Sequence, residues 1–276
     1  GESRVTGNES ERERERPGSK GPGRFFFAGP GYLADDPPIL RATAAGWAGI
    51  AAGINFPMSH SLPLILVPTA VERHTLEPLL SPLCKAGSEL ELCGFGPVAA
   101  AARTAHLLAD RRPSRVLLLG IAGSLDDRLA VGTACRFSEV ACFGVGVGSG
   151  RDFVRAGDLA WHQWPGDPRS ESSPIGDRLP CFAAPPSQTH RAPLLLTSCA
   201  ASACADDARA RKAMFPEAMA EDMEGFAVAL ACRLRGVPLD IIRGISNVAG
   251  DRDKSRWQVH AALAAAAALA CSSVEV

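Results

Sequence analysis

The sequence has few aromatic residues and almost no net charge. Aromatic side chains make up 6% of the 276 residues, with a single tyrosine, and 29 basic residues face 30 acidic ones. Binding to nucleic acid or to an anionic membrane surface needs an excess of positive charge, and single-stranded nucleic acid needs aromatic stacking platforms. We therefore expect neither nucleic acid nor a membrane among the partners of this protein.

The nine cysteines and six histidines form no metal-ligand or redox motif. No CxxC, HxH or HExxH spacing occurs, and most cysteines lie in apolar stretches. This pattern predicts free, buried thiols in a reducing compartment, the cytoplasm, with no metal and no cofactor. The apolar run at residues 261–271 is short and rich in alanine, which favours a buried C-terminal helix over a membrane span.

The N-terminal part of the chain differs in composition from the rest. The stretch "NESERERERPGSKGPG" combines a run of charges with glycine and proline, which is typical of disorder. We expect residues 1–57 to be a disordered N-terminal extension, either a flexible tail or the product of a misassigned gene start, with a targeting segment as the alternative. The folded domain is expected at residues 58–276.

From residue 58 onward, apolar runs typical of buried strands alternate with segments of helical periodicity. This alternation predicts an α/β fold, a single domain with a mostly parallel, mixed central sheet flanked by helices. A loop insertion rich in Pro, Gly and Ser is expected near residues 148–192. Strands are expected at 62–68, 89–96, 114–123, 133–147, 193–200 and 238–247, and helices near 69–84, 97–111, 205–214, 222–235 and 255–272.

Three motifs lie where ligands bind in such folds, at the carboxyl ends of the strands. Glu72 follows the first strand in "LILVPTAVER", and a later buried strand ends in "GIAG" at residues 120–123. The third motif, "FPEAMAEDMEG", leads to a strand that ends in "RGISN". Glu221 and Asp222 fit the first turn of a helix near 222–235, where acidic residues suit the helix dipole.

In this order, the motifs resemble those of the nucleoside phosphorylase/nucleosidase superfamily over residues 62–272. Within it they are similar to the purine nucleosidases: the methylthioadenosine/S-adenosylhomocysteine nucleosidases and, more closely, the futalosine hydrolases. The resemblance implies a nucleoside phosphorylase-like fold and an N-glycosyl hydrolase that takes a small-molecule nucleoside. It also implies a homo-oligomer.

The resemblance also implies roles for individual residues. Met223 and Glu224 would hold the ribose, because a carboxylate can accept hydrogen bonds from both hydroxyls of a 2′,3′-diol. Glu72 would activate a water for attack on the anomeric carbon, with Arg243 nearby as its partner. The more ordinary role of both glutamates is that of a carboxylate at a helix start.

Two small residues, Ala122 and Gly123, would let the backbone approach the base or the sugar closely. Their more ordinary role is a tight turn between a strand and a helix.

Asn247 departs from the methylthioadenosine nucleosidases, where an aspartate at this position protonates adenine. An amide cannot act as a general acid, but it can donate a hydrogen bond to O6 or N7 of hypoxanthine. The resemblance with this change implies hydrolysis of futalosine to hypoxanthine and dehypoxanthinyl futalosine, a step in menaquinone biosynthesis. Asp251 or Asp253 could assist with a proton, although Asp253 is better suited to cap the final helix.

Other functions remain open at this point. A methylthioadenosine/S-adenosylhomocysteine-type nucleosidase or a purine nucleoside phosphorylase would share the motifs. Glu72 would repel phosphate and no good anion-binding set is evident, which favours a hydrolase, although Ile121 replaces a residue that is often polar in the nucleosidases. Outside this class, "GFGP" could mark a dinucleotide-binding module, but it lacks the third glycine. A relative that binds nucleosides without turnover is the last alternative.

Overall fold

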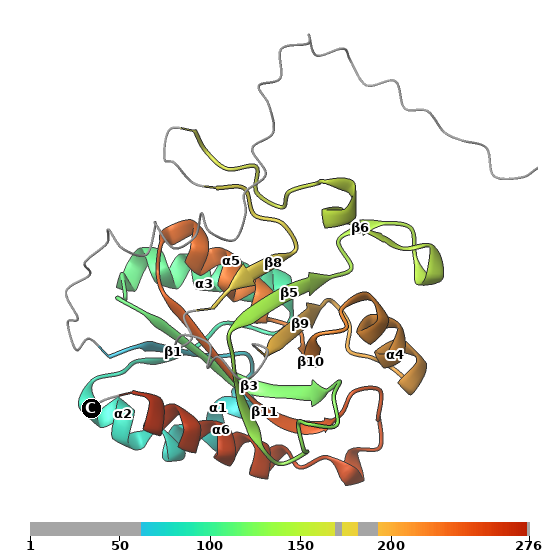
Figure 1. The fold of residues 1–276 in the computed structure, drawn as a ribbon. Coiled ribbons are helices and arrows are strands. Elements are labelled where there is room, and N and C mark those ends of the chain that lie inside the picture. The colour runs from blue at the N-terminus through green and yellow to red at the C-terminus, as the bar shows by residue number, and fades with distance from the viewer. Residues whose placement is uncertain (1–61, 169–172, 182–192, 275–276) are drawn as a thin grey trace, which may run out of the picture. The chain divides into compact units, whose positions relative to one another are not determined.

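The centre of the fold is a mixed sheet with helices on both faces (Figure 1). The computed structural model describes residues 62–168, 173–181 and 193–274, all within the unit Pro57–Val276, and these residues form a nine-stranded sheet. This confirms the predicted single α/β domain with a mostly parallel, mixed sheet. The extension expected at residues 1–57 lies outside the described residues and stays a prediction.

Strand β3 organises the half of the sheet that carries most of the parallel pairings. Strand β11 runs parallel to β3 along its whole length. The other edge of β3 is shared, because β1 pairs with its first half in parallel and β10 pairs antiparallel with Gly123 and Ser124 at its end. The strands of this half are β1 (Leu64–Val67), β2 (Leu90–Leu92), β3 (Val116–Ser124), β10 (Ala218–Asp222) and β11 (Leu239–Val248).

The sheet continues beyond β10 and also beyond β11. Beyond β10 come β9 and β5 in parallel and then β8 antiparallel, whereas β4 lies antiparallel to β11. Only Ser138 separates β4 from β5 in the chain. This one segment therefore pairs with β11 through β4 and with β9 and β8 through β5. These strands are β4 (Ala134–Phe137), β5 (Glu139–Phe143), β8 (Arg178–Pro180) and β9 (Leu194–Ser198), and β6 (Gly146–Val147) pairs with β7 (Val154–Arg155) in a small separate sheet.

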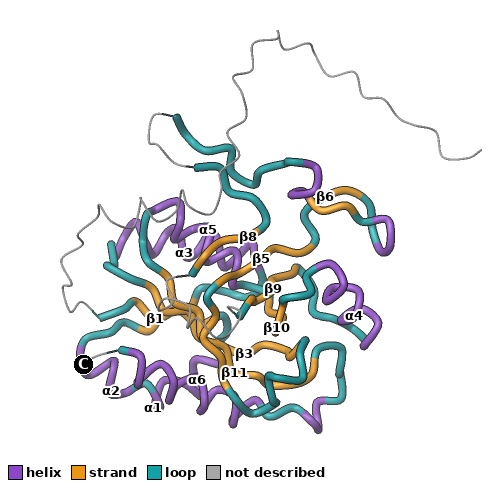
Figure 2. The backbone as a smooth tube through the Cα atoms, in the orientation of Figure 1, coloured by secondary structure: helices purple, strands orange, loops and turns teal. Residues whose placement is uncertain are grey.

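Helices cover the two faces of the sheet in two groups (Figure 2). Helices α1, α2 and α6 lie on one face, and α3 and α5 pack together on the other. Alternate residues of β1 face each group: Leu64 and Leu66 join the core under α3 and α5, whereas Ile65 and Val67 join the core under α6. Because both of its faces are buried, β1 is continuously apolar. The helices are α1 (Ala70–Leu79), α2 (Ser81–Ala86), α3 (Pro97–Arg111), α4 (Ala205–Met214), α5 (Gly225–Arg235) and α6 (Val259–Ser273).

A glycine allows β11 and α6 to approach one another closely. A Cβ at Gly244 would collide with the backbone of Ala262 on α6. Glycine at this position therefore serves packing between a strand and a helix, not a turn.

The helix expected near residues 222–235 is shorter than predicted. It begins at Gly225, and Glu221 and Asp222 belong to strand β10, which pairs with β9. The prediction that these two acids stabilise a first helical turn was therefore wrong. The carboxylate of Asp222 instead accepts a hydrogen bond from Gly225 N at 2.8 Å, so it satisfies the start of α5 from outside the helix.

Three other expectations need smaller corrections. The segment 69–84 forms two helices, α1 and α2, that meet at Leu80. Asp253 caps a short 3-10 helix at Lys254–Arg256 and not the final helix, whose N-cap is Gln258. All nine cysteines are free, but only Cys93 and Cys232 are fully buried.

The structure also describes parts of the expected loop insertion and bears on the expectation of no membrane span. Within the loop insertion expected near residues 148–192, the described parts contain 3-10 turns at Gly150–Asp152 and Ala156–Leu159 and the strand β8. In the described ranges we find no helix with both the length and the apolar character needed to cross a membrane.

Candidate active site

A cavity of about 460 Å³ opens at the carboxyl ends of β1, β3, β10 and β11. Six of the seven residues predicted from the sequence line this cavity, and the seventh, Arg243, lies behind its wall. Within the described ranges, no group of three or more His, Cys, Asp or Glu is placed to hold a metal ion. The six predicted lining residues are Glu72, Ala122, Gly123, Met223, Glu224 and Asn247.

Glu72 is fixed by hydrogen bonds at the start of α1. Thr69 is the N-cap, and its backbone N–H and its hydroxyl both donate to Glu72 Oε2, at 3.1 and 2.6 Å. The other carboxylate oxygen, Oε1, accepts from Ile121 N on β3 at 3.0 Å. The carboxylate is almost fully buried yet lines the cavity, so it is presented to a ligand in one orientation.

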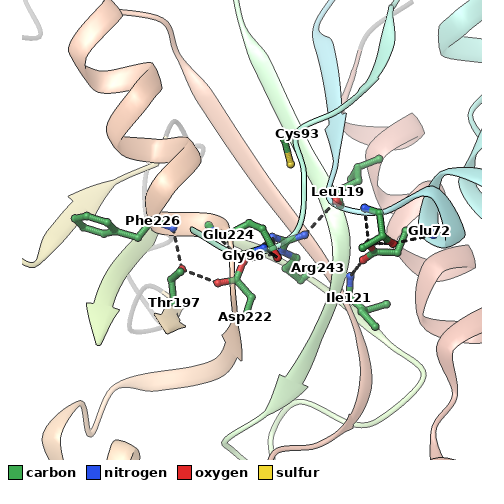
Figure 3. A network of polar contacts seen from close by, with 12 residues as sticks. Glu72, Cys93, Gly96, Leu119, Ile121, Thr197, Asp222, Glu224, Phe226 and Arg243 are labelled. Atoms are coloured by element: carbon green, nitrogen blue, oxygen red, sulfur yellow. Dashed lines mark hydrogen bonds and ion pairs between the residues drawn. The ribbon is translucent and has the colours of Figure 1, made fainter. Parts of the chain in front are cut away.

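Arg243 is a fully buried cation in the centre of the site (Figure 3). Its Nε and Nη2 both donate to Asp222 Oδ2, at 3.1 and 2.6 Å, and its Nη1 donates to Leu119 O at 3.1 Å. Glu224 Oε2 lies 3.4 Å from Nη2. Arg243 thus lies near Glu72, but the residue that holds its guanidinium by hydrogen bonds is Asp222.

Gly120 explains how Glu72 and Arg243 come close without a hydrogen bond between them. A Cβ on this residue of β3 would collide with the guanidinium of Arg243 and lie 2.8 Å from Glu72 Oε1. The missing side chain thus leaves room for both charged groups beside the strand.

Glu224 lies between Arg243 and the cavity. Its Oε1 accepts from Gly96 N at 2.8 Å, and it is the N-cap residue of α5, with 4% of its surface exposed. Burial, opposed by the charge of Arg243 and reinforced by that of Asp222, raises the pKa of Glu224 to about 7. This carboxyl group therefore changes its charge close to neutral pH.

Asn247 lines the cavity at the end of β11 with its amide held on both sides. Its Oδ1 accepts from Ser246 Oγ at 2.8 Å, and its Nδ2 donates to Val248 O at 2.8 Å. One hydrogen of Nδ2 remains without a partner among the described residues, and it is available to a ligand.

Packing explains why a glycine occupies position 123 of β3. A Cβ at Gly123 would lie 3.3 Å from the Cα of Ala249, so the glycine serves the packing of the loop after β11. Gly123 and Ala122 both line the cavity, and Met223 joins them from the turn between β10 and α5.

Several residues of the site carried no recognisable signal in the sequence. Asp222 was assigned to a helix, and Gly120 was given no function. Glu221 also lines the cavity, where it accepts hydrogen bonds from Ser202 N and Oγ and from Arg211 Nη1, at 2.8, 2.7 and 2.6 Å. The capping-box pattern Thr69–Glu72 is a sequence signature that could have predicted the fixed position of Glu72.

The fold and the cavity define an α/β protein with a small-molecule site at the carboxyl ends of its sheet strands. The sequence profile of the phosphorylase superfamily matches residues 89–275. The chain therefore belongs to the phosphorylase superfamily. This confirms the resemblance found in the motifs, and with it the expectation of an enzyme.

Relatives of known function are nucleosidases by name. The chain is 31% identical over 185 residues to a futalosine hydrolase of Streptomyces coelicolor, covering 65% of this chain and 75% of the relative. It is 30% identical over 172 residues to a 5′-methylthioadenosine/S-adenosylhomocysteine nucleosidase of Tolumonas auensis, covering 62% and 73%.

Solved structures share the fold at lower identity. Futalosine hydrolase of Helicobacter pylori matches with a TM-score of 0.57 and 17% identity, covering 75% of this chain and 94% of that one. A 5′-methylthioadenosine/S-adenosylhomocysteine nucleosidase of Neisseria meningitidis, in complex with methylthio-immucillin-A, matches with a TM-score of 0.56 and 20% identity, covering 75% and 95%.

The buried pair of Asp222 and Arg243 yields a stability prediction. Asp222→Asn should lower the free energy of unfolding by about 3 kcal/mol, because it leaves a buried guanidinium without its main counter-charge. Urea denaturation of the variant and the wild type measures the difference. The control is Asp206→Asn, which breaks an exposed pair with Arg209 and should change stability little. Equal effects of the two substitutions would contradict the prediction.

Proposed function

We propose that this enzyme hydrolyses the N-glycosidic bond of futalosine, releasing hypoxanthine and dehypoxanthinyl futalosine in menaquinone biosynthesis. The observation that carries the proposal is the presence of two buried carboxylates, Glu72 and Glu224, on one cavity that ends in an amide at Asn247. The relative from Streptomyces coelicolor, a futalosine hydrolase by name, supports the choice of substrate. A cytoplasmic location and a homo-oligomer are part of the proposal through the family resemblance.

In this proposal Glu224 and Met223 hold the ribose. Glu224 has one oxygen on Gly96 N and the other beside Arg243, so the carboxylate is fixed before the substrate arrives. Each oxygen retains a further lone pair that can accept a hydrogen bond from one hydroxyl of the 2′,3′-diol. Met223 supplies an apolar contact for the face of the sugar.

Glu72 activates the water. It accepts a proton from the water as the oxygen attacks C1′, while the electron pair of the C1′–N9 bond moves to the purine. The purine leaves as hypoxanthine after taking a proton from solvent. The nearby positive charge of Arg243, kept in place by Asp222, offsets the negative charges that Glu72 and Glu224 bring to the site.

Asn247 stabilises the leaving group without donating a proton outright. The free hydrogen of Nδ2 can be donated to O6 or N7 of hypoxanthine as negative charge develops on the ring. The hydrogen bonds to Ser246 and Val248 hold the amide in place, so no reorganisation is needed at the moment of bond breakage.

Two other reactions remain candidates on specific observations. The relative from Tolumonas auensis is a methylthioadenosine/S-adenosylhomocysteine nucleosidase by name, which favours an adenine nucleoside as the second choice. The superfamily also contains phosphorylases, but phosphate near C1′ would meet the carboxylate of Glu72. That repulsion favours water as the nucleophile.

Base release distinguishes these reactions. The purified full chain is incubated with futalosine, inosine or methylthioadenosine, each with and without phosphate, and free bases are quantified by chromatography. We expect hypoxanthine from futalosine at a rate independent of phosphate. Release of adenine from methylthioadenosine, with no base released from the other two nucleosides, would show that the substrate is an adenine nucleoside and not futalosine. Release of base only in the presence of phosphate would show that the reaction is phosphorolysis and not hydrolysis.

The pKa of Glu224 predicts the pH dependence of turnover. Because the ribose hydroxyls require the ionised carboxylate and burial raises its pKa to about 7, kcat/KM should rise about tenfold per pH unit up to pH 7 and then level off. Initial rates from pH 5 to 9 measure this. Glu224→Gln should be less active at every pH, and its kcat/KM should no longer rise between pH 5 and pH 7. If the rise persists in that variant, it reports the titration of another group.

Asn247 predicts base selectivity. Asn247→Asp should shift preference toward adenine nucleosides, because a carboxyl group can protonate N7 or accept a hydrogen bond from the exocyclic amine. We expect the ratio of kcat/KM for futalosine to that for its 6-amino analogue to fall by about tenfold, equivalent to roughly 1.4 kcal/mol. An unchanged ratio would remove Asn247 from base recognition.

A further inference from the structure

The acidic groups in the cavity wall all have partners of their own. Glu72 is bonded to Thr69 and Ile121 N, and Glu221 is bonded to Ser202 and Arg211. The remaining two, Asp222 and Glu224, share Arg243. None of these carboxylates therefore depends on the cations at the other part of the wall.

Two cations of the cavity wall have no acidic partner. Arg252 and Lys254 line the cavity from the loop between β11 and α6, and neither forms an ion pair among the described residues. The acids of the same loop are already engaged, because Arg256 pairs with Asp251 at 2.8 Å and lies 3.5 Å from Asp253. This loop therefore presents two positively charged side chains, without ion-pair partners among the described residues, at its part of the cavity wall.

An indole ring lies beside Arg252. The guanidinium of Arg252 sits over the ring of Trp257, 5.3 Å from its centroid, and Trp257 Nε1 donates to Asp251 O at 3.0 Å. The hydrogen bond fixes the ring, which is half-buried and also lines the cavity. We call Arg252, Lys254 and Trp257 together the basic rim.

Neither the base nor the sugar of a purine nucleoside can satisfy the basic rim. Hypoxanthine and ribose are neutral at pH 7, so a negative charge must come from another part of the ligand. A flat ring beside a guanidinium, with an ammonium on the same loop, suits an aromatic acid, whose ring stacks while its carboxylate pairs with the guanidinium and the ammonium.

We propose that the basic rim binds an aromatic carboxylate attached to the 5′ end of the nucleoside and so selects acidic nucleosides over neutral ones. The proposal rests on the proposed function for the identity of the nucleoside, since futalosine carries a benzoate group beyond its ribose. It assigns specificity for that group to three residues of one loop.

Paired substrates test the basic rim. Futalosine and its methyl ester differ in charge and by one methyl group, and kcat/KM is measured for both with the wild type and with Arg252→Gln/Lys254→Gln. The wild type should prefer the acid by about tenfold or more, mainly through KM, because the ester cannot form charge-assisted hydrogen bonds with the guanidinium and the ammonium. The double variant should lose most of this preference.

Arg256→Gln is the matched control. Arg256 lies in the same loop but pairs with Asp251 and does not line the cavity, so the substitution should leave the preference for the acid in place. A wild type that treats acid and ester alike would overturn the proposal, as would a double variant that retains the full preference.

Failure of the proposed function gives a different result. If no hypoxanthine is released from futalosine, isothermal titration of the wild type with the acid and the ester decides on the basic rim alone. If the wild type binds the acid more tightly than the ester and the double variant does not, the proposed role of the basic rim is supported. If the wild type does not bind futalosine, that role is overturned. Base release that requires phosphate, with the requirement lost in the double variant, would assign the two cations to phosphate and overturn the proposal.

Discussion

The site depends on one buried cation. Arg243 has no exposed surface, and the energetic cost of burying its charge is met by Asp222 from the neighbouring part of the sheet. This pair joins β11 to the end of β10, and Gly120 leaves the space in which the guanidinium fits. With Arg243 in place, Glu72 and Glu224 can both stand at one cavity despite their like charges.

The arrangement of the sheet explains why these groups meet. Strand β3 is flanked by β11 along its full length but changes partner on its other edge from β1 to β10. The change leaves the carboxyl end of β1, with Glu72 just beyond it, next to the end of β10, with Glu224 just beyond it. A ligand at this point contacts residues far apart in the sequence, which is the general property of sites at strand ends.

The sequence predicted the elements that local patterns determine. Helix α3 lies at residues 97–111 as expected, since Pro97 at its first turn and its apolar spacing are local signals. Asp222 was misplaced because its strand is defined by pairing with β9, which composition does not reveal. Motifs in the sequence pointed to Glu72 and Glu224. The importance of Gly120 follows from a steric contact, and that of the basic rim from the lack of acidic partners among the described residues. Neither of these can be read from the sequence.

Gly244 limits how the site can adjust to ligands. Because its Cα lies against the backbone of Ala262, β11 and α6 cannot slide past one another without breaking this contact. Arg243, behind the cavity wall, and Asn247, in the wall, are on that same strand, so the contact with α6 also limits how far they can shift. The loop between β11 and α6, which carries Arg252, Lys254 and Trp257 at the cavity wall, lies outside this contact, so its side chains can adjust to a ligand without moving Arg243 or Asn247.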